Sequence, residues 1–140
     1  MSTLLAFDFG EVRIGVAVGS VELGIPHPVG TIAARDNDTR FARIAELIAQ
    51  WEPAELVVGL PLAPDGEAHA LTALARKFAR RLSGRFGLPV VLVDERYSSA
   101  AADSALREIG VRGRRQKPVL DQVAAMQILQ DRLAQLARAG

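Results

Sequence analysis

The order of the apolar segments predicts an α/β fold: a mixed five-stranded sheet flanked by helices, with three antiparallel strands followed by two parallel ones. The first three expected strands lie so close together in the sequence that no crossover helix fits between them, so they pair antiparallel. The later two alternate with helical segments, as parallel strands joined by right-handed crossovers do. A length of 140 residues fits one domain, residues 1–140.

The expected strands are short and rich in Val, Leu, Ile and Ala, and glycine or proline lies at or near their ends. A tight turn containing Gly10 predicts that the first two form a hairpin. The last two are continuous apolar runs, which is typical of strands buried on both faces. The five strands are expected at residues 3–9, 12–19, 29–34, 56–60 and 90–93.

Four helices are expected from apolar residues at helical spacing and from residues that start or stop helices. Residues 36–39 supply the start of the first helix, and Pro53 ends it. In the second, we expect Ala70, Leu71, Leu74, Phe78 and Leu82 to face inward and the Arg/Lys side chains to face outward. Pro118 suits the first turn of the last helix. The helices are expected at about residues 39–51, 67–85, 98–109 and 118–138.

The composition excludes several kinds of protein. The chain has no cysteine, and therefore no disulfide, thiolate metal site or cysteine nucleophile, which fits a reducing compartment. The sequence shows neither a signal-peptide pattern nor an apolar run long enough to span a bilayer. We therefore expect a soluble cytoplasmic domain with no membrane partner.

The charge is distributed unevenly, although its net value is only +1. Residues 76–117 contain 11 Lys and Arg but only 4 Asp and Glu, a local charge of +7, and the remainder carries −6. Such segregation is typical of a protein that binds a polyanion such as nucleic acid. The alternative is a set of solvated basic helix faces.

Three acidic positions stand out because they follow or flank buried segments. Asp8 lies near the end of the first strand, Asp94-Glu95 follows the last strand, and Asp121 lies in the first turn of the final helix. Active residues of α/β sheets gather at the carboxyl ends of strands, so these acids are expected to meet at one edge. Crowded carboxylates repel one another unless cations bind them, and oxygen-only ligands favour Mg²⁺ or Mn²⁺. Two such ions catalyse phosphodiester cleavage in many nucleases.

Each acid also has a structural explanation when it is considered alone. Asp8 suits a turn next to glycine, and either Asp94 or Glu95 suits a partner for Arg96. Asp121 suits the positive end of the final helix dipole. The spacing of the acids does not decide between these roles and metal binding.

Four sequence blocks in a fixed order extend this pattern across nearly the whole chain. They resemble the RuvX (YqgF) family of bacterial RNase H-like nucleases, also called Holliday-junction resolvases or pre-16S rRNA nucleases. The blocks are Asp8-Phe9-Gly10 with Arg13-Ile14-Gly15-Val16-Ala17, Gly59-Leu60-Pro61 with Asp65-Gly66, Asp94-Glu95-Arg96 with Ser98-Ser99 and Ala101, and Lys117 with Asp121, Ala124, Ala125, Ile128 and Leu129.

This resemblance implies an RNase H-like fold and a hydrolase acting on ester bonds. It implies that Asp8, Glu95 and Asp121 are the catalytic, metal-binding acids, with Mg²⁺ or Mn²⁺ as cofactor. It also implies a cytoplasmic enzyme that matures the 5′ end of 16S rRNA, with ribosomal precursor particles as partners. The chain departs from the family pattern at Val12, where a basic residue is usual, and at Tyr97, where leucine is usual. These departures concern substrate contacts and leave the acids intact.

Six basic residues are candidates for contacts with nucleic acid. For Arg13 the alternative is a surface salt bridge, and for Arg96 it is orientation of the neighbouring carboxylate. The other four form a basic segment just before the last helix, for which a solvated loop is the alternative. The six are Arg13, Arg96, Arg112, Arg114, Arg115 and Lys117.

Three further functions compete with rRNA processing. One is a Holliday junction resolvase acting on branched DNA, for which a homodimer is expected because a four-way junction is two-fold symmetric. An rRNA nuclease is free to act as a monomer. Another is a nucleic-acid-binding ribosome-assembly or transcription factor with little catalysis. The last is an actin-like or sugar-kinase ATPase, which needs two such domains around its nucleotide.

Overall fold

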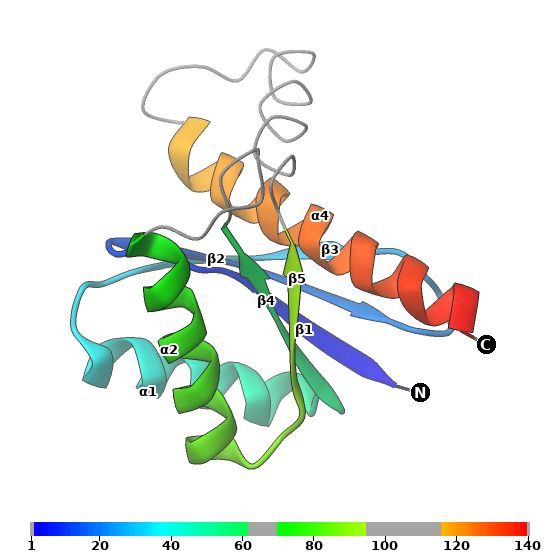
Figure 1. Ribbon diagram of the computed structural model, residues 1–140, viewed down its shortest axis with the longest axis horizontal. Helices are drawn as coiled ribbons and strands as arrows, with labels where there is room; N and C mark the ends of the chain where they lie inside the picture. The colour runs from blue at the N-terminus through cyan, green and yellow to red at the C-terminus, as the bar shows by residue number, and fades with distance from the viewer. Residues whose placement is uncertain (1, 62–69, 95–115, 140) are drawn as a thin grey trace.

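The computed structural model of the chain describes residues 2–61, 70–94 and 116–139, with the side chains of 116–119 and 139 not included. The described part contains five strands and three helices (Figure 1). In chain order they are β1 (Thr3–Asp8), β2 (Arg13–Ser20), β3 (His27–Ala33), α1 (Asn37–Trp51), β4 (Glu55–Leu60), α2 (Ala70–Phe86), β5 (Val90–Asp94) and α4 (Gln116–Ala139).

The strands form one mixed sheet in the order β3-β2-β1-β4-β5. β1, β2 and β3 pair antiparallel, whereas β4 pairs parallel with both β1 and β5. The fold class predicted from the sequence is therefore confirmed. The carboxyl ends of β1, β4 and β5 lie at the same edge of the sheet.

The two faces of the sheet carry separate hydrophobic cores, because successive side chains of a strand point to opposite faces. On β1, Leu5 and Phe7 pack in the core beneath α1 and α2, whereas Leu4 and Ala6 pack in the core beneath α4. Figure 1 shows α1 and α2 on one side of the sheet and α4 crossing the other.

Helix α1 begins and ends where the sequence indicates. Asp36 is its N-cap and accepts a 2.8 Å hydrogen bond from the backbone N–H of Thr39. Hydrogen bonding from the Thr39 side chain, and then from its backbone, lowers the pKa of the Asp36 carboxyl. The helix ends at Glu52, whose φ of 47° is left-handed, directly before Pro53.

Two strand predictions need correction. The third strand begins at His27 rather than at residue 29, because Pro28 is tolerated on the edge strand β3, next to an irregularity in its pairing with β2. The expectation that the last strand is buried on both faces was wrong. β5 is an edge strand in which Val93 is buried while Leu92 and Asp94 are exposed.

The inward face of α2 differs from the predicted one at two positions. Phe78 and Leu82 are buried as expected, but Ala70 and Leu74 are exposed. Thr72 is buried instead, and its hydroxyl donates a hydrogen bond to the carbonyl oxygen of Pro61. The predicted first turn of this helix, at 67–69, and the helix predicted at 98–109 lie outside the described residues.

Helix α4 is fixed to the sheet by polar contacts as well as by its core. Gln122 Nε2 donates a 3.1 Å hydrogen bond to Thr31 Oγ1 on β3. Ten residues further along α4, Arg132 forms two 2.9 Å hydrogen bonds with the two carboxylate oxygens of Glu55 at the start of β4. This bidentate contact raises the pKa of the Arg132 guanidinium. Among the described helices, none is both long and apolar enough to cross a membrane.

Candidate active site

Asp8 is the last residue of β1 and is half-buried. Leu4 and Ala6 contact the α4 core, so strand alternation directs Asp8, two residues further on, to the same face. Its cross-strand neighbour is Gly15 of β2. The carboxylate thus lies on the α4 side of the sheet, at the edge where the parallel strands end.

At Gly15 the backbone of α4 comes very close to the sheet. A Cβ atom on this glycine would overlap the main-chain carbonyl of Asp121 and press against its Cβ. Because Gly15 lies directly opposite Asp8 in the β1–β2 pair, Asp8 and Asp121 flank the same glycine. A glycine in a strand interior often marks such a close approach of another backbone.

Arg13 connects the start of β2 to Asp121. Its Nε donates a 2.8 Å hydrogen bond to Oδ2 of Asp121, and the two side chains are 34% and 20% exposed. This partial burial makes the contact stronger than a fully exposed pair. The salt-bridge alternative for Arg13 is therefore observed, with Asp121 as the partner, while its contact with nucleic acid stays a prediction.

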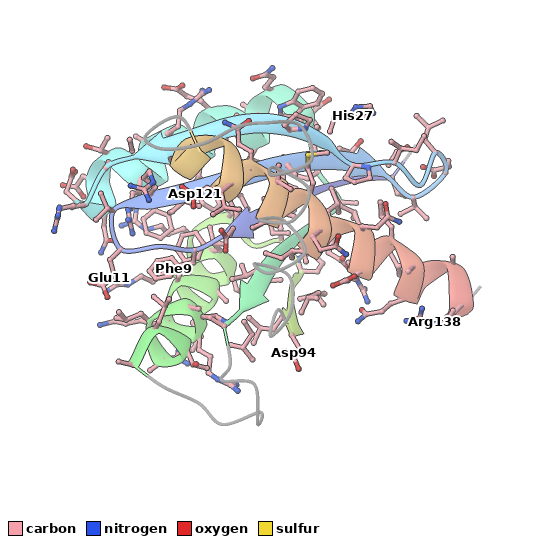
Figure 2. The ribbon with its side chains drawn as sticks, turned by 90° about the horizontal axis from the view of Figure 1, so that it is seen from above. Phe9, Glu11, His27, Asp94, Asp121 and Arg138 are labelled. Carbon is pink, nitrogen blue, oxygen red and sulfur yellow. The ribbon has the colours of Figure 1, made fainter. Side chains whose placement is uncertain are left out.

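Asp94, from the remaining one of the three acidic positions, lies apart from Asp121. Asp94 is exposed at the end of β5 and borders a pocket with Asp131 and Arg138, from the C-terminal half of α4. Figure 2 shows Asp121 in the first turns of α4, apart from Asp94 and Arg138. In the part of the chain that the structure describes, no third His, Cys, Asp or Glu completes a metal-binding cluster. Glu95 lies outside the described residues, so its role stays a prediction.

The described acids fit the chemistry of a hard divalent cation. Asp8 and Asp121 supply only carboxylate oxygens, which suit Mg²⁺ or Mn²⁺ rather than zinc. Arg13 binds only Oδ2 of Asp121, and no hydrogen bond within the described residues occupies Oδ1. The same guanidinium fixes the orientation of the Asp121 carboxylate, as outer contacts of metal ligands do.

Five of the six side chains predicted to contact nucleic acid lie outside the described part of the chain. Arg96, Arg112, Arg114 and Arg115 lie outside the described residues, and of Lys117 only the backbone, in the first turn of α4, is described. Sequence reasoning missed Arg40, which is only 4% exposed. The available signal was its position: Arg40, Ile44 and Leu47 occur at the i, i+4, i+7 spacing of an inward helix face.

The strand order and the flanking helices define a class of protein, those with an RNase H-like fold. The structure matches T. thermophilus RuvC, solved in complex with a Holliday junction substrate, with a TM-score of 0.58 and 16% sequence identity. The match covers 100% of this chain and 97% of RuvC, and it shows a shared fold.

The sequence places the chain in one family within that class. The model of the family described as "RuvX: Holliday junction resolvase" matches residues 2–135, so the chain belongs to the RuvX family. A relative from Chromobacterium violaceum is 65% identical over 89% of this chain and 92% of its own length. One from Methylobacillus flagellatus is 64% identical over 91% of this chain and 87% of its own. Both are named "Putative pre-16S rRNA nuclease".

Proposed function

We propose that this protein is a divalent-metal-dependent nuclease that cleaves phosphodiester bonds of precursor 16S rRNA at its 5′ end. The observation that carries the proposal is the placement of Asp8 and Asp121 on either side of Gly15, on one face of the sheet. The names of the two relatives support the choice of rRNA as substrate. Ribosomal precursor particles in the cytoplasm are the corresponding partners.

In this proposal Asp8, Glu95 and Asp121 hold Mg²⁺ or Mn²⁺. When bound in pairs, such ions activate a water for attack and stabilise the leaving oxygen. The protein's own task is to hold the carboxylates in place. Arg13 serves that task at Asp121, because its hydrogen bond restricts rotation of the Asp121 side chain.

The basic residues are proposed to bind the nucleic-acid backbone. Arg96, Arg112, Arg114, Arg115 and Lys117 precede Asp121 in the sequence and follow the strand that leads to Glu95. Contacts of this kind fix the position of a strand without reading its sequence. Binding is then expected to weaken steeply with salt.

A second candidate function is cleavage of four-way DNA junctions. The description of the matching family supports it, since that description is Holliday junction resolvase. The same acids would serve either substrate, so substrate preference must be measured directly. A resolvase would in addition be a homodimer.

The test is cleavage of a 16S precursor and of a four-way junction in magnesium, by the wild type and by Asp8→Asn and Asp121→Asn. We expect the precursor to be cut faster than the junction. Each variant should lose at least about 1,000-fold in rate, or ~4 kcal/mol of transition-state stabilisation. Asp131→Asn, a change of the same kind on the same helix, should cut at the wild-type rate.

Two outcomes would overturn parts of this proposal. If Asp8→Asn and Asp121→Asn cut as fast as the wild type, these acids do not form the catalytic site. If no protein cuts, but RNA binding is intact and falls when Arg114 and Arg115 are changed to alanine, the chain is a nucleic-acid-binding factor instead.

A further inference from the structure

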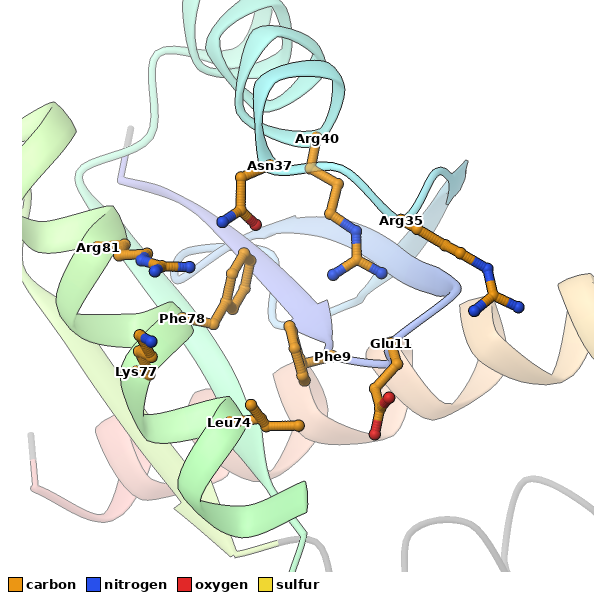
Figure 3. A pocket seen from close by; sticks show the side chains of 9 residues that line it. All are labelled: Phe9, Glu11, Arg35, Asn37, Arg40, Leu74, Lys77, Phe78 and Arg81. Carbon is orange, nitrogen blue, oxygen red and sulfur yellow. The ribbon is translucent and has the colours of Figure 1, made fainter. Parts of the chain in front are cut away.

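A basic pocket of about 310 Å³ lies on the other face of the sheet from Asp121. Its walls come from the start of α1, from α2 and from the turn between β1 and β2 (Figure 3). Four of the lining side chains are cationic and one, Glu11, is acidic. The cations are Arg35, Arg40, Lys77 and Arg81.

The positive charge of this pocket is only partly offset by the described protein, through Glu11 and Asp36, whose carboxylates act electrostatically on Arg40. In the residues that the structure describes, no carboxylate forms an ion pair with any of the four cations, whereas Arg13, Arg43 and Arg132 elsewhere all have such partners. Asn37, which also lines the pocket, is the first residue of α1, whose positive helix end already has the Asp36 carboxylate as its N-cap, so the four cations are the main source of positive charge here. The pocket is thus complementary to an anion.

Arg40 is held rigidly at the back of the pocket. Its Nε donates to the carbonyl of Ala34 at 2.5 Å, its Nη2 donates to the carbonyl of Gly10 at 2.6 Å, and its guanidinium lies 5.5 Å from the centre of the Phe9 ring. Burial lowers the pKa of this guanidinium, which reflects the unfavourable free energy of a charge with little water around it. A bound anion would relieve that cost.

The pocket and the acid site meet at the end of β1. Asp8 and Phe9 are consecutive residues, and strand alternation directs the first to the α4 face and the second to the α1/α2 face. Phe9 is half-buried and its ring lies 5.0 Å from that of Phe78, so an apolar wall adjoins the cations. Figure 3 shows Phe9 between Arg40 and the side chains of α2.

We propose that this pocket binds a backbone phosphate of the nucleic-acid strand whose cleaved bond lies at Asp8, on the opposite side of the β1–β2 turn. The assignment rests on the proposed nuclease function for the identity of the strand. Two arginines, a lysine and the buried Arg40 match the charge and the hydrogen-bonding capacity of a phosphate group. The pocket then fixes the strand away from the reacting bond.

Helix α2 supplies a matched pair of variants for the test. Lys77 and Arg81 line the pocket, whereas Arg76 and Arg80 border a different depression, next to β5. All four side chains are exposed, so Lys77→Gln/Arg81→Gln and Arg76→Gln/Arg80→Gln remove the same charge from the same helix without disturbing the core. Thermal melts will establish that both variants fold.

The measurement is fluorescence anisotropy of a short single-stranded RNA with the full chain in EDTA, so that binding is observed without cleavage. Lys77→Gln/Arg81→Gln should weaken binding about tenfold, and Arg76→Gln/Arg80→Gln by less than about twofold. Equal weakening by both double variants would show general electrostatic attraction and would overturn the assignment of this pocket as a phosphate site. Because the assay requires no cleavage, the two double variants can still be compared if the nuclease proposal fails.

Adenosine monophosphate distinguishes a strand from a free nucleotide. It should compete with the RNA only weakly, and its own binding should be reduced by Lys77→Gln/Arg81→Gln. If the mononucleotide binds as tightly as the RNA, the pocket is a small-molecule site and the assignment to a strand is wrong.

Discussion

The two faces of the sheet are built from side chains of very different size. Beneath α4, strands β1 and β2 present mostly small apolar residues, namely Ala6, Gly15, Ala17 and Gly19, with Leu4 as the larger exception. Beneath α1 and α2, the same two strands present large side chains such as Phe7 and Ile14, and the helices add further aromatic rings. Small residues let α4 approach the strand backbone closely, whereas large residues hold α1 and α2 at a distance.

This difference determines what each face does at the end of β1. The close approach at Gly15 brings Asp121 to the glycine that lies opposite Asp8, an arrangement that suits a compact metal site. The wider spacing on the other face leaves a pocket beside Phe9 and Phe78, which suits a phosphate group. The end of β1 therefore has Asp8 and Asp121 on one face of the sheet and the cationic pocket on the other.

The larger expected effect on stability comes from the aromatic face. The Phe78 ring lies 6.0, 5.0 and 5.8 Å from the rings of Phe7, Phe9 and Phe41. Phe78→Ala should lower the free energy of unfolding by about 3–5 kcal/mol, because it removes a buried ring and leaves a cavity. Urea denaturation measures this loss, with Phe78→Leu expected to lose about 1–2 kcal/mol. A loss of less than 1 kcal/mol for the alanine variant would show that the rings do not hold this face together.

On the face beneath α4, the expected effect on stability is smaller, but a large effect on cleavage is expected as well. Gly15→Ala should destabilise the fold by about 2–3 kcal/mol, because its methyl group displaces α4 at Asp121. The rate of cleavage should fall about 100-fold as the carboxylates separate.

Gly30→Ala is the control for this change, since a Cβ on Gly30 of β3 meets no atom within 4 Å. It should alter stability by less than about 0.5 kcal/mol and leave the rate unchanged. Should Gly15→Ala cut as fast as Gly30→Ala, the approach of α4 is not what assembles the site.

The topology of the sheet could be predicted from the sequence because the apolar segments are short and clearly separated by turns. The alternation of strands and helices predicted which strands run parallel, and the position of Asp8 at a strand end predicted an edge site. The burial of β5 was predicted wrongly, since an apolar run of four residues fits an edge strand as well as a central one.

The composition of the site could be predicted only in part. That Asp121 reaches the sheet depends on the glycine opposite Asp8, a register that the spacing of residues does not reveal. The helical spacing predicts that Leu74 faces the core, yet it is exposed and lines the basic pocket, because periodicity does not show where a pocket interrupts the packing of a helix. The burial of Arg40 depends on carbonyl groups 6 and 30 residues away in sequence.

The most direct test of the acid site is a calorimetric titration of the full chain with Mn²⁺. The wild type and Asp131→Asn, which changes an α4 acid hydrogen-bonded to Gln127, should bind the metal with equal affinity. Asp8→Asn and Asp121→Asn should each weaken binding at least about tenfold, because each removes a carboxylate ligand. Equal Mn²⁺ affinity in all four proteins would contradict the proposal that Asp8 and Asp121 form one metal site.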